Sequence, residues 1–286
     1  MNIRFLLLIS FALLLSLVAS VADARPKIIV SEIDKIILGK KLDKFSKDQN
    51  LSTGELILKI GFDFKGTPYV AKTLDKDIEE SLVINLRELD CTTFVENVLA
   101  IALTIKRGKP SFETFCNELE KIRYRKGHLS GYTSRLHYFS EWITDNAAKG
   151  IVTDVTHELG GLNHPLSLNF MGTHPNLYPQ LIGNSSFTDN IRQVEKEISE
   201  KIYYYIPKEK VPNCEPELTN GDIVALTTRI AGLDVSHLGL IYKKGGQTFL
   251  LNASSLDMMV EVTHKTLAEY LNGSKSVTGI FVIRAR

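Results

Sequence analysis

Apolar positions follow two different patterns along the chain. In the first part they recur at intervals of three and four residues, the spacing of an amphipathic helix. This spacing predicts helices over residues 31–46, 53–62, 90–107, 112–123, 134–148 and 189–201. Farther on, short apolar or alternating segments between turns predict strands over residues 222–227, 235–242, 248–252, 258–262 and 277–284, with a short helix over 267–271. Helices followed by a meander of strands are typical of an α+β domain with an antiparallel sheet.

The segment over residues 160–190 fits neither pattern. It is rich in Gly, Asn, Pro and Ser and predicts a long irregular insertion. Loops of that length inside a compact domain are often functional. The expected organisation is one domain over residues 25–286, with a helical extension at its N-terminal side and this insertion near its middle.

The N-terminus has the organisation of a secretory signal peptide. Arg4 precedes an apolar run over residues 5–18, and Ala22-Asp23-Ala24 fits a cleavage site. We therefore expect residues 1–24 to be removed, and the mature chain to be exported to a periplasm or secreted. An uncleaved membrane anchor is the alternative, but the apolar run is short for a span of roughly 20 residues. After cleavage no membrane association is expected.

The charge balance limits the classes of partner. The chain has 286 residues, 34 Lys and Arg against 33 Asp and Glu, and a formal net charge of +1. A general phosphate binder needs a basic excess, so a nucleic-acid partner is not expected. The sequence contains no HExxH, no Cys-x-x-Cys and no glycine-rich nucleotide-binding pattern. Neither a metal nor a cofactor is therefore indicated.

Cys91 is the first candidate for chemistry. The three cysteines are an odd number for an exported chain, so at least one thiol is free. Cys91 directly follows Asp90, a favourable helix N-cap, and the positive end of a helix favours the nucleophilic thiolate. The Asp90 carboxylate opposes this effect. On position alone, a small buried cysteine is an equally good interpretation. Cys116 and Cys214 have no comparable surroundings.

A base for Cys91 is expected at the start of a strand. His237 occupies that position, where the backbone can hold its ring rigidly. Asn252 ends the next strand, and adjacent antiparallel strands would bring it near His237. Its amide oxygen could accept a hydrogen bond from Nδ1–H and fix the tautomer, although an asparagine that begins a turn is common. The three residues suggest a nucleophile, a base and an orienting group.

Several segments together resemble a known family. They are Gly66-Thr67-Pro68-Tyr69, Leu89-Asp90-Cys91-Thr92-Thr93-Phe94-Val95-Glu96, Gly131-Tyr132-Thr133-Ser134-Arg135-Leu136-His137-Tyr138-Phe139, Asn169-Phe170-Met171, Ser236-His237-Leu238-Gly239 and Asn252-Ala253-Ser254. In this order they resemble the papain-like NlpC/P60 cell-wall hydrolases, and most of all the DUF1460 group of N-acetylmuramoyl-L-alanine amidases. The resemblance spans roughly residue 50 to the C-terminus and implies a papain-like α+β fold.

The resemblance also implies roles for individual residues. Cys91 is then the nucleophile, His237 the base and Asn252 the orienting residue, a place where many relatives have histidine. Tyr69 matches a tyrosine beside the catalytic cysteine, and its hydroxyl could hold the thiolate or the oxyanion.

Three further residues are candidate substrate contacts. They are Ser134, Arg135 and Ser236, with Arg135 suited to a muropeptide carboxylate. A solvated arginine in the first turn of a helix is the alternative for Arg135.

The implied reaction is hydrolysis of the amide between N-acetylmuramic acid and L-Ala, in peptidoglycan or its fragments. Cleavage of another bond within the stem peptide is a close alternative. A wall-binding module without turnover is a third, which the Cys91–His237 pair argues against.

Overall fold

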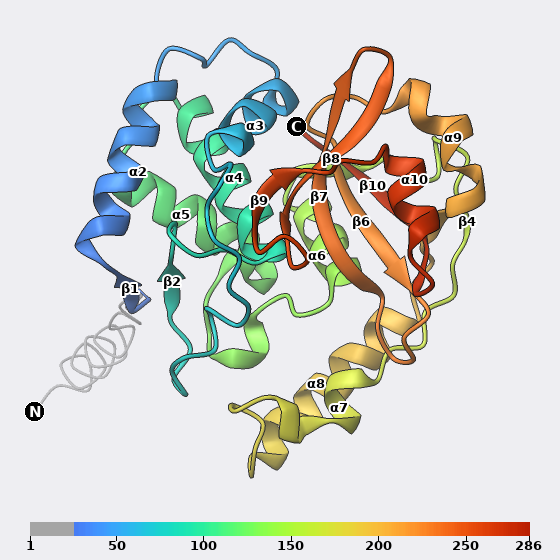
Figure 1. Cartoon of the computed structure of the whole chain (residues 1–286). Helices are drawn as coiled ribbons and strands as arrows, with labels where there is room; N and C mark the ends of the chain where they lie inside the picture. Colours follow the sequence, from blue (N-terminus) through green and yellow to red (C-terminus); the bar gives the residue numbers. More distant parts are fainter. Residues whose placement is uncertain (1–25) are drawn as a thin grey trace, which may run out of the picture.

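The computed structural model describes residues 26–286, so the predicted signal peptide lies outside the described residues. The helices within residues 32–123 lie on one side of the molecule and the large sheet on the other, with the short helices over residues 211–214 and 267–273 beside the sheet (Figure 1). The helices of the described residues are α2 (Glu32–Phe45), α3 (Thr53–Phe62), α4 (Cys91–Lys106), α5 (Phe112–Arg123), α6 (Phe139–Ala148), α7 (Phe170–Thr173), α8 (Ser185–Ser199), α9 (Val211–Cys214) and α10 (Leu267–Gly273). Short 3-10 turns occur at η1 (Arg125–Gly127), η2 (Tyr132–Ser134), η3 (Pro175–Leu177), η4 (Lys208–Lys210) and η5 (Glu215–Glu217).

The large sheet contains the strands that the alternation predicted. Its strands are β3 (Val152–Asp154), β4 (Leu162–Asn163), β5 (Tyr204–Pro207), β6 (Ile223–Thr228), β7 (Val235–Lys244), β8 (Gln247–Ser254), β9 (Met259–Val262) and β10 (Val277–Ala285). The order is β4-β5-β10-β6-β7-β8-β9, with β3 also paired to β10, and every pairing is antiparallel. Gly245 and Gly246 connect β7 to β8 with positive φ at both positions, as a tight hairpin turn requires. This mixture of helices and antiparallel sheet fits the predicted α+β class.

Five short strands were not predicted: β3, β4 and β5 of the large sheet, and two strands that lie outside it. β1 (Ile28–Val30) and β2 (Leu82–Ile84) form a separate parallel pair on the helical side. Each has only three residues, too few to show a period, and the pairing joins segments far apart in the chain. Nothing local in the sequence identifies such a pair.

Helix α6 begins later than predicted. The helical spacing suggested a start at residue 134, but Arg135 and Tyr138 have extended backbones and the helix starts at Phe139. Tyr138 makes no side-chain cap. Instead the carboxylate of Asp234, distant in sequence, accepts a hydrogen bond from the Ser140 backbone N–H at 2.7 Å. The start of α6 is therefore set by a cap that the local sequence does not contain.

The predicted irregular insertion contains more regular structure than expected. Residues 169–199, which we call the arm, comprise α7, η3 and α8 and project at the lower end of Figure 1. Helix α8 starts at Ser185, four residues before the predicted start, because Asn184 caps it by accepting from Phe187 N–H at 3.0 Å.

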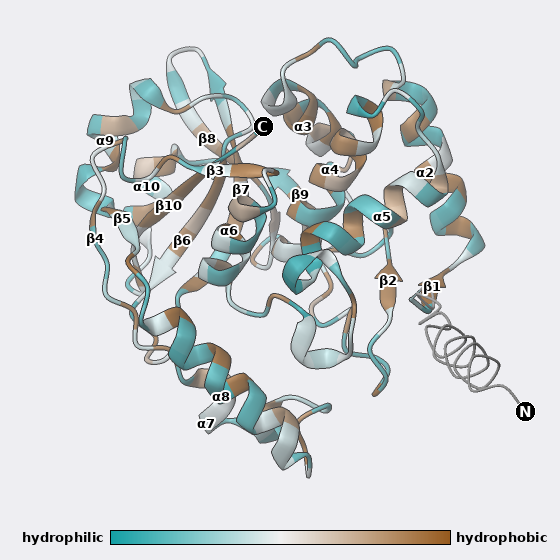
Figure 2. Ribbon diagram, turned by 180° about the vertical axis from the view of Figure 1, so that it is seen from behind, coloured by the Kyte–Doolittle hydropathy of each residue, from teal (hydrophilic) through white to brown (hydrophobic). Residues whose placement is uncertain are grey.

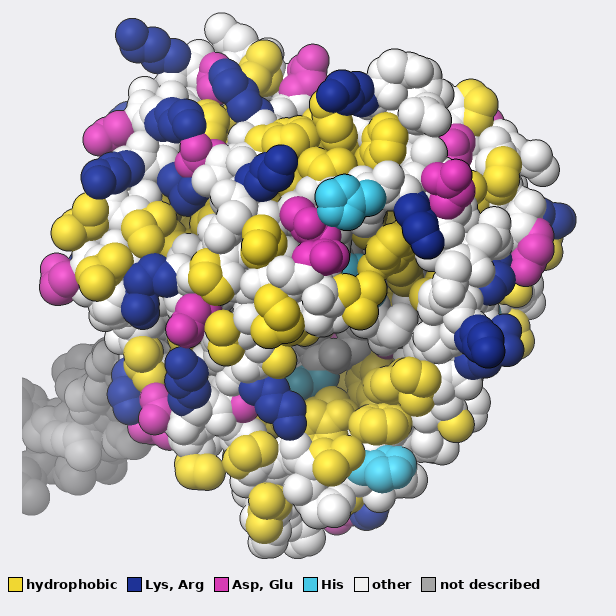
Figure 3. Space-filling model, in the orientation of Figure 1, with side chains coloured by type: hydrophobic (Ala, Val, Ile, Leu, Met, Phe, Trp, Pro, Cys, Tyr) yellow, Lys and Arg dark blue, Asp and Glu magenta, His cyan; other side chains and the backbone are white. Residues whose placement is uncertain are grey.

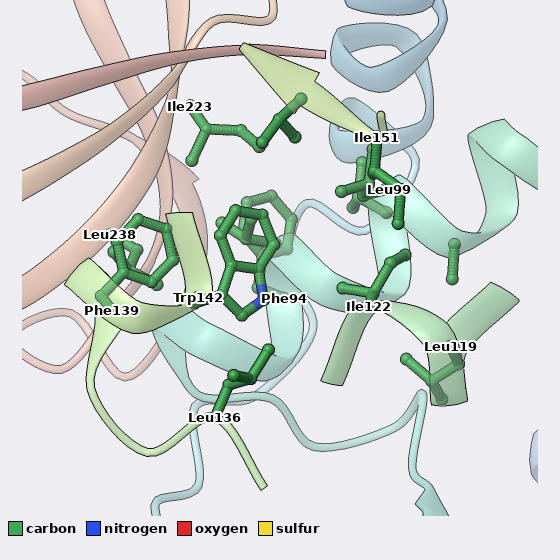
Figure 4. Close-up of a cluster of buried hydrophobic side chains, with 14 of the residues drawn as sticks. Phe94, Leu99, Leu119, Ile122, Leu136, Phe139, Trp142, Ile151, Ile223 and Leu238 are labelled. Atoms are coloured by element: carbon green, nitrogen blue, oxygen red, sulfur yellow. The ribbon is translucent and has the colours of Figure 1, made fainter. Parts of the chain in front are cut away.

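Helix α4 lies in the centre of the molecule and packs against α3, α5, β7 and β8. Figure 2 shows hydrophobic residues concentrated on α4 and on the central strands. Beside α4, the Trp142 ring stacks on Phe139 at 4.7 Å between ring centroids, and residues from α4, α5, β6 and β7 surround it (Figure 4). Trp142 is 1% exposed and Phe94 is fully buried. Burying such a side chain contributes roughly 1.5–3 kcal/mol, so α4 is a rigid support for the residue at its first position. Within residues 26–286, none of the helices combines the length and apolar character needed to cross a bilayer.

Candidate active site

Cys91 is the first residue of α4, at the end of the helix that faces the sheet. Asp90 Oδ1 accepts from Thr93 N–H at 2.8 Å, and Asp90 N–H donates to Thr93 Oγ1 at 2.9 Å. This reciprocal pair of bonds fixes the start of the helix. The predicted N-cap role of Asp90 is thereby confirmed, and the position of the Cys91 backbone follows from it.

The thiol of Cys91 is not stabilised as a thiolate in the resting structure. Burial and the Asp90 carboxylate raise its pKa to about 12, although hydrogen bonds from the Leu238 backbone and from Thr92 oppose the rise. The expectation that the helix end favours a thiolate is thus outweighed by desolvation. Cys91 needs a base before it can act as a nucleophile.

His237 and Asn252 lie side by side on β7 and β8. His237 Nε2–H donates to Asn252 Oδ1 at 2.8 Å, so the predicted contact is confirmed. The predicted donor atom, Nδ1, is wrong. Leu240 pairs with Leu251, and continuing this register places Asn252 two residues along the sheet from His237. Nε2, at the tip of the imidazole ring, reaches across that distance better than Nδ1 does. Burial lowers the pKa of His237, and the Asn252 hydrogen bond raises it in part. A neutral ring with Nε2–H keeps its Nδ1 lone pair available as a base.

A cavity of about 210 Å³ brings Cys91 and His237 together. Its walls are the start of α4, residues 136–139, Met171 and Tyr178 of the arm, and residues 233–238. Figure 3 shows a hollow above the arm with histidine atoms deep inside and hydrophobic side chains along its lower wall. The predicted Ser236 lies at this cavity and is exposed. Among the described residues that line it, none is Lys or Arg.

Tyr69 is near Cys91 but is not part of the lining of this cavity. It is joined to the β8–β9 connection through its backbone N–H, which donates to the Met258 carbonyl at 2.9 Å. Burial, followed by the charges of Cys91 and Asp90, raises the pKa of Tyr69 to about 12. The phenol therefore remains protonated and can donate a hydrogen bond near the sulfur.

Ser134 and Arg135 do not line the cavity. Ser134 Oγ donates to the Gly131 carbonyl at 2.7 Å and accepts from Ser130 N–H at 2.9 Å. The Arg135 guanidinium donates to Asp75 and to both oxygens of Glu80, at 2.7–2.9 Å. Burial alone would lower the pKa of Arg135, but Glu80 and Asp75 raise it overall. Substrate binding by Ser134 and Arg135 stays a prediction, and in the structure their contacts shape the loop that leads to residue 137.

His137 is a polar residue of the cavity that sequence analysis passed over. Its Nε2–H donates to the Tyr132 carbonyl at 2.9 Å, and its ring packs on the Tyr132 ring at 4.5 Å between centroids. Burial, followed by the charge of Arg135, lowers its pKa to about 3. His137 lies inside one of the segments that carry the family resemblance, and this was the only feature of the sequence that could have identified it as a candidate site residue.

The arm is attached to this site at two points. The Phe170 N–H donates to the Gly232 carbonyl at 3.2 Å, and a Cβ on Gly232 would lie 2.4 Å from Asn169 Oδ1. Tyr138 donates to the buried Glu195 carboxylate at 2.6 Å and accepts from Met171 N–H at 3.1 Å. The turn before β7 and the loop before α6 therefore hold the arm against the cavity.

Comparison with known proteins agrees with this geometry. The sequence model of a family described as AmiA-like, N-acetylmuramoyl-L-alanine amidase-like, matches residues 59–280. The chain belongs to this family. Cys91, His237 and Asn252 lie inside the matched range, whereas α2 lies before it. A search of curated proteins gives no match.

Solved structures support the assignment to the amidase-like family. An N-acetylmuramoyl-L-alanine amidase from Bacteroides uniformis ATCC 8492 is 40% identical, with a TM-score of 0.79, over 82% of this chain and 99% of that one. A Bacteroides fragilis protein named as a putative xylanase is 44% identical, with a TM-score of 0.76, over 79% and 99%. A DUF1460 protein from Legionella pneumophila str. Philadelphia 1 is 21% identical, with a TM-score of 0.68, over 88% and 95%, and shows the fold alone.

The other cysteines are remote from this chemistry. Cys116 and Cys214 are buried free thiols, and burial raises the pKa of each to about 11. Over residues 26–286, no three His, Cys, Asp or Glu side chains are grouped so that they could hold a metal ion.

Proposed function

We propose that this chain is an exported cysteine amidase that hydrolyses the amide between N-acetylmuramic acid and L-Ala in peptidoglycan or its fragments. The observation that carries the proposal is the shared cavity of Cys91 and His237, with His237 held by Asn252, in a chain of the amidase-like family. The papain-like NlpC/P60 assignment belongs to the same proposal, with support from a helix-borne cysteine facing a strand-borne histidine.

The mechanism begins from two neutral groups. The pKa of Cys91 is raised and the pKa of His237 is lowered, so a preformed thiolate–imidazolium pair is disfavoured. His237 takes the thiol proton as the sulfur attacks the lactyl carbonyl. The Asn252 oxygen stabilises the imidazolium through the Nε2–H bond. The imidazolium then gives its proton to the departing amino group of L-Ala, leaving a thioester on Cys91.

Water completes the cycle. His237 accepts a proton from the water that attacks the thioester, and returns a proton to the sulfur as the carboxylic acid leaves. The developing oxyanion lies near the first turn of α4, where the N–H groups that Asp90 does not bind can donate to it. The Tyr69 hydroxyl is a second candidate donor, since it remains protonated beside Cys91.

The cavity does not support glycoside hydrolysis, the activity in the name of the Bacteroides fragilis relative. Glycoside hydrolysis ordinarily uses two carboxyl groups that flank the scissile bond. The described residues of the cavity include one carboxylate, Asp234, and its oxygens accept from Ser140 and Val235 N–H groups. A catalytic carboxylate pair is therefore lacking in the described part of this cavity.

The test uses the mature chain with defined muropeptides and mass analysis of the products. Wild type should release free L-Ala-peptide from N-acetylmuramoyl-L-Ala-peptide, and Cys91→Ala should abolish release while the melting temperature stays close to that of wild type. Cys116→Ala and Cys214→Ala are matched controls that should keep most activity. Normal turnover by Cys91→Ala would overturn the mechanism.

The same experiment separates the alternatives. Products cut within the stem peptide would assign a peptidase, and binding without any product would assign a wall-binding module. Export is tested separately by N-terminal sequencing of the native protein. A start near Arg25 supports cleavage, and an intact Met1 favours an anchor.

A further inference from the structure

We propose that His137 determines substrate specificity by accepting a hydrogen bond from an uncharged donor on the sugar half of the substrate. The proposal rests on the proposed function and assigns a place to one half of its substrate. The donor is a hydroxyl or an acetamido N–H of the muramoyl residue, and the acceptor is Nδ1.

The tautomer of His137 follows from its contact with Tyr132. A carbonyl oxygen only accepts, so the nitrogen that faces it at 2.9 Å, Nε2, carries the hydrogen. In the neutral ring Nδ1 then has a free lone pair. Among residues 26–286, Nδ1 has no hydrogen-bond partner, and the atom is accessible to solvent. It therefore opens into the cavity that the ring lines.

Neighbouring residues keep this acceptor fixed and uncharged. The ring packs on Tyr132, which also lies 5.2 Å from the Arg135 guanidinium carbon. Arg135 is anchored in turn by Glu80 and Asp75. Burial and the repulsion of the nearby Arg135 both disfavour a positive charge on His137, and together they lower the pKa of its ring. At neutral pH the group is an acceptor and not an ion-pairing cation.

The charge of the cavity selects the sugar half of the substrate. A stem peptide carries carboxylates, and a desolvated carboxylate needs a cation or several hydrogen-bond donors. Among the described residues the lining offers no Lys or Arg, and its one carboxylate, Asp234, already caps α6. Apolar groups such as Leu136 and Tyr178 fit the C–H faces of a sugar ring. The cavity is also smaller than the roughly 300–1,000 Å³ that encloses a whole ligand of drug size, so it encloses only part of the substrate.

Two substitutions separate an acceptor role from a structural role. The asparagine oxygen occupies the place of Nδ1, whereas the glutamine amide nitrogen occupies the place of Nε2. His137→Asn thus keeps the acceptor and loses the bond to Tyr132, and His137→Gln does the reverse. Each is assayed on N-acetylmuramoyl-L-Ala-peptide and on lactoyl-L-Ala-peptide, which lacks the sugar. The ratio of the two kcat/KM values does not depend on the fraction of protein that is folded.

We expect His137→Gln to lower this ratio about tenfold or more, because the sugar donor is left unpaired in the cavity. His137→Asn should keep a ratio close to that of wild type.

An unchanged ratio in His137→Gln, an equal fall in both variants, or a fall in His137→Asn alone would overturn the proposal. A loss on both substrates with an unchanged ratio would also do so, since it assigns the donor to the peptide. Wild type that cleaves neither substrate overturns the proposed function as well, whereas an active wild type with an unchanged ratio overturns this inference alone.

Discussion

Two walls of one cavity each present a histidine, and they hold it in different ways. The strand wall, residues 235–238 with Asn252, fixes His237 through a neutral amide on the neighbouring strand. The loop wall, residues 131–138, fixes His137 through a backbone carbonyl of the same loop. Behind the loop wall lies a buried ion-pair network, whereas the shift at His237 comes from burial and from Asn252.

In the proposed mechanism this difference gives the two rings different roles. The pKa of His237 is lowered by burial, but the Asn252 hydrogen bond partly restores it, so that ring can take and return a proton. The pKa of His137 falls to about 3 because burial is joined by the repulsion of Arg135. The same side chain is suited to proton transfer on one wall and to fixed hydrogen bonding on the other.

The largest effect that distinguishes the walls is expected at His237. His237→Ala should lower kcat by about 10²- to 10⁴-fold, the usual contribution of a general base, with a smaller effect on substrate binding. Steady-state kinetics on a defined muropeptide would measure it. His137→Asn is the matched control on the other wall and should retain most of its kcat. Comparable losses in both variants would mean that proton transfer is not confined to the strand wall.

The next largest effect concerns stability of the loop wall. Arg135→Met should lower the free energy of unfolding by about 3–5 kcal/mol, because it leaves the buried carboxylate of Glu80 without its cation. Urea unfolding followed by circular dichroism would measure it. Lys196→Met is a suitable control, since Lys196 pairs with Glu200 at 4.0 Å on the surface, and it should change stability by less than about 0.5 kcal/mol. A small effect of Arg135→Met would show that the network does not hold the wall.

The two walls also show what sequence can and cannot reveal. The strand wall was predicted because alternation identifies strands, adjacent strands place their ends together, and the hairpin turn at Gly245-Gly246 fixes the pairing. Asp90 and Cys91 were placed for a similar reason, since a helix N-cap is a local signal. Each of these features depends on residues that are close in the chain or on neighbouring strands.

The loop wall depends on contacts between distant residues. Arg135 pairs with residues about 60 positions earlier, and Ser140 is capped by a residue 94 positions later. The periodicity of residues 134–148 therefore suggested a helix start that the structure places at Phe139. Arg135 was expected to bind substrate because its internal partners, Asp75 and Glu80, lie far away in the sequence and cannot be identified from the residues around it. The orientation of the His237 ring was missed because strand prediction gives neighbours but not which ring nitrogen faces them.

A pH dependence of stability should also distinguish the walls. The pKa of His137 is about 3 in the folded protein and about 6.5 when unfolded, so the unfolded state binds more protons in between. Stability contributed by this group is complete above about pH 6.5 and is lost as the pH falls toward 3. Between pH 6.5 and 5 the loss should reach up to about 2 kcal/mol. Urea unfolding at several pH values should show a smaller loss in His137→Asn, and equal slopes would exclude a buried neutral ring.

The smallest effect is expected at Asn252, which in the proposed mechanism orients the base without touching the reacting bond. Asn252→Ala removes a neutral hydrogen-bond acceptor, so the imidazolium of the transition state should be less stable by about 0.5–1.5 kcal/mol. This corresponds to roughly a tenfold fall in kcat at most. Asn252→His should be tolerated, because an imidazole nitrogen can also accept from Nε2–H. The effect should fall on kcat more than on KM.

The pH–rate profile makes the test of Asn252 specific. His237 must be neutral to act as a base, so the rate should rise with pH through its pKa, which lies below 6.5. The Asn252 hydrogen bond raises that pKa, so its removal in Asn252→Ala should move the acid limb to still lower pH. The opposite limb belongs to Cys91, whose pKa of about 12 places it beyond ordinary assay conditions. A lower plateau with an unmoved acid limb would mean that Asn252 supports the strand but does not act through His237, and packing alone would then orient the ring.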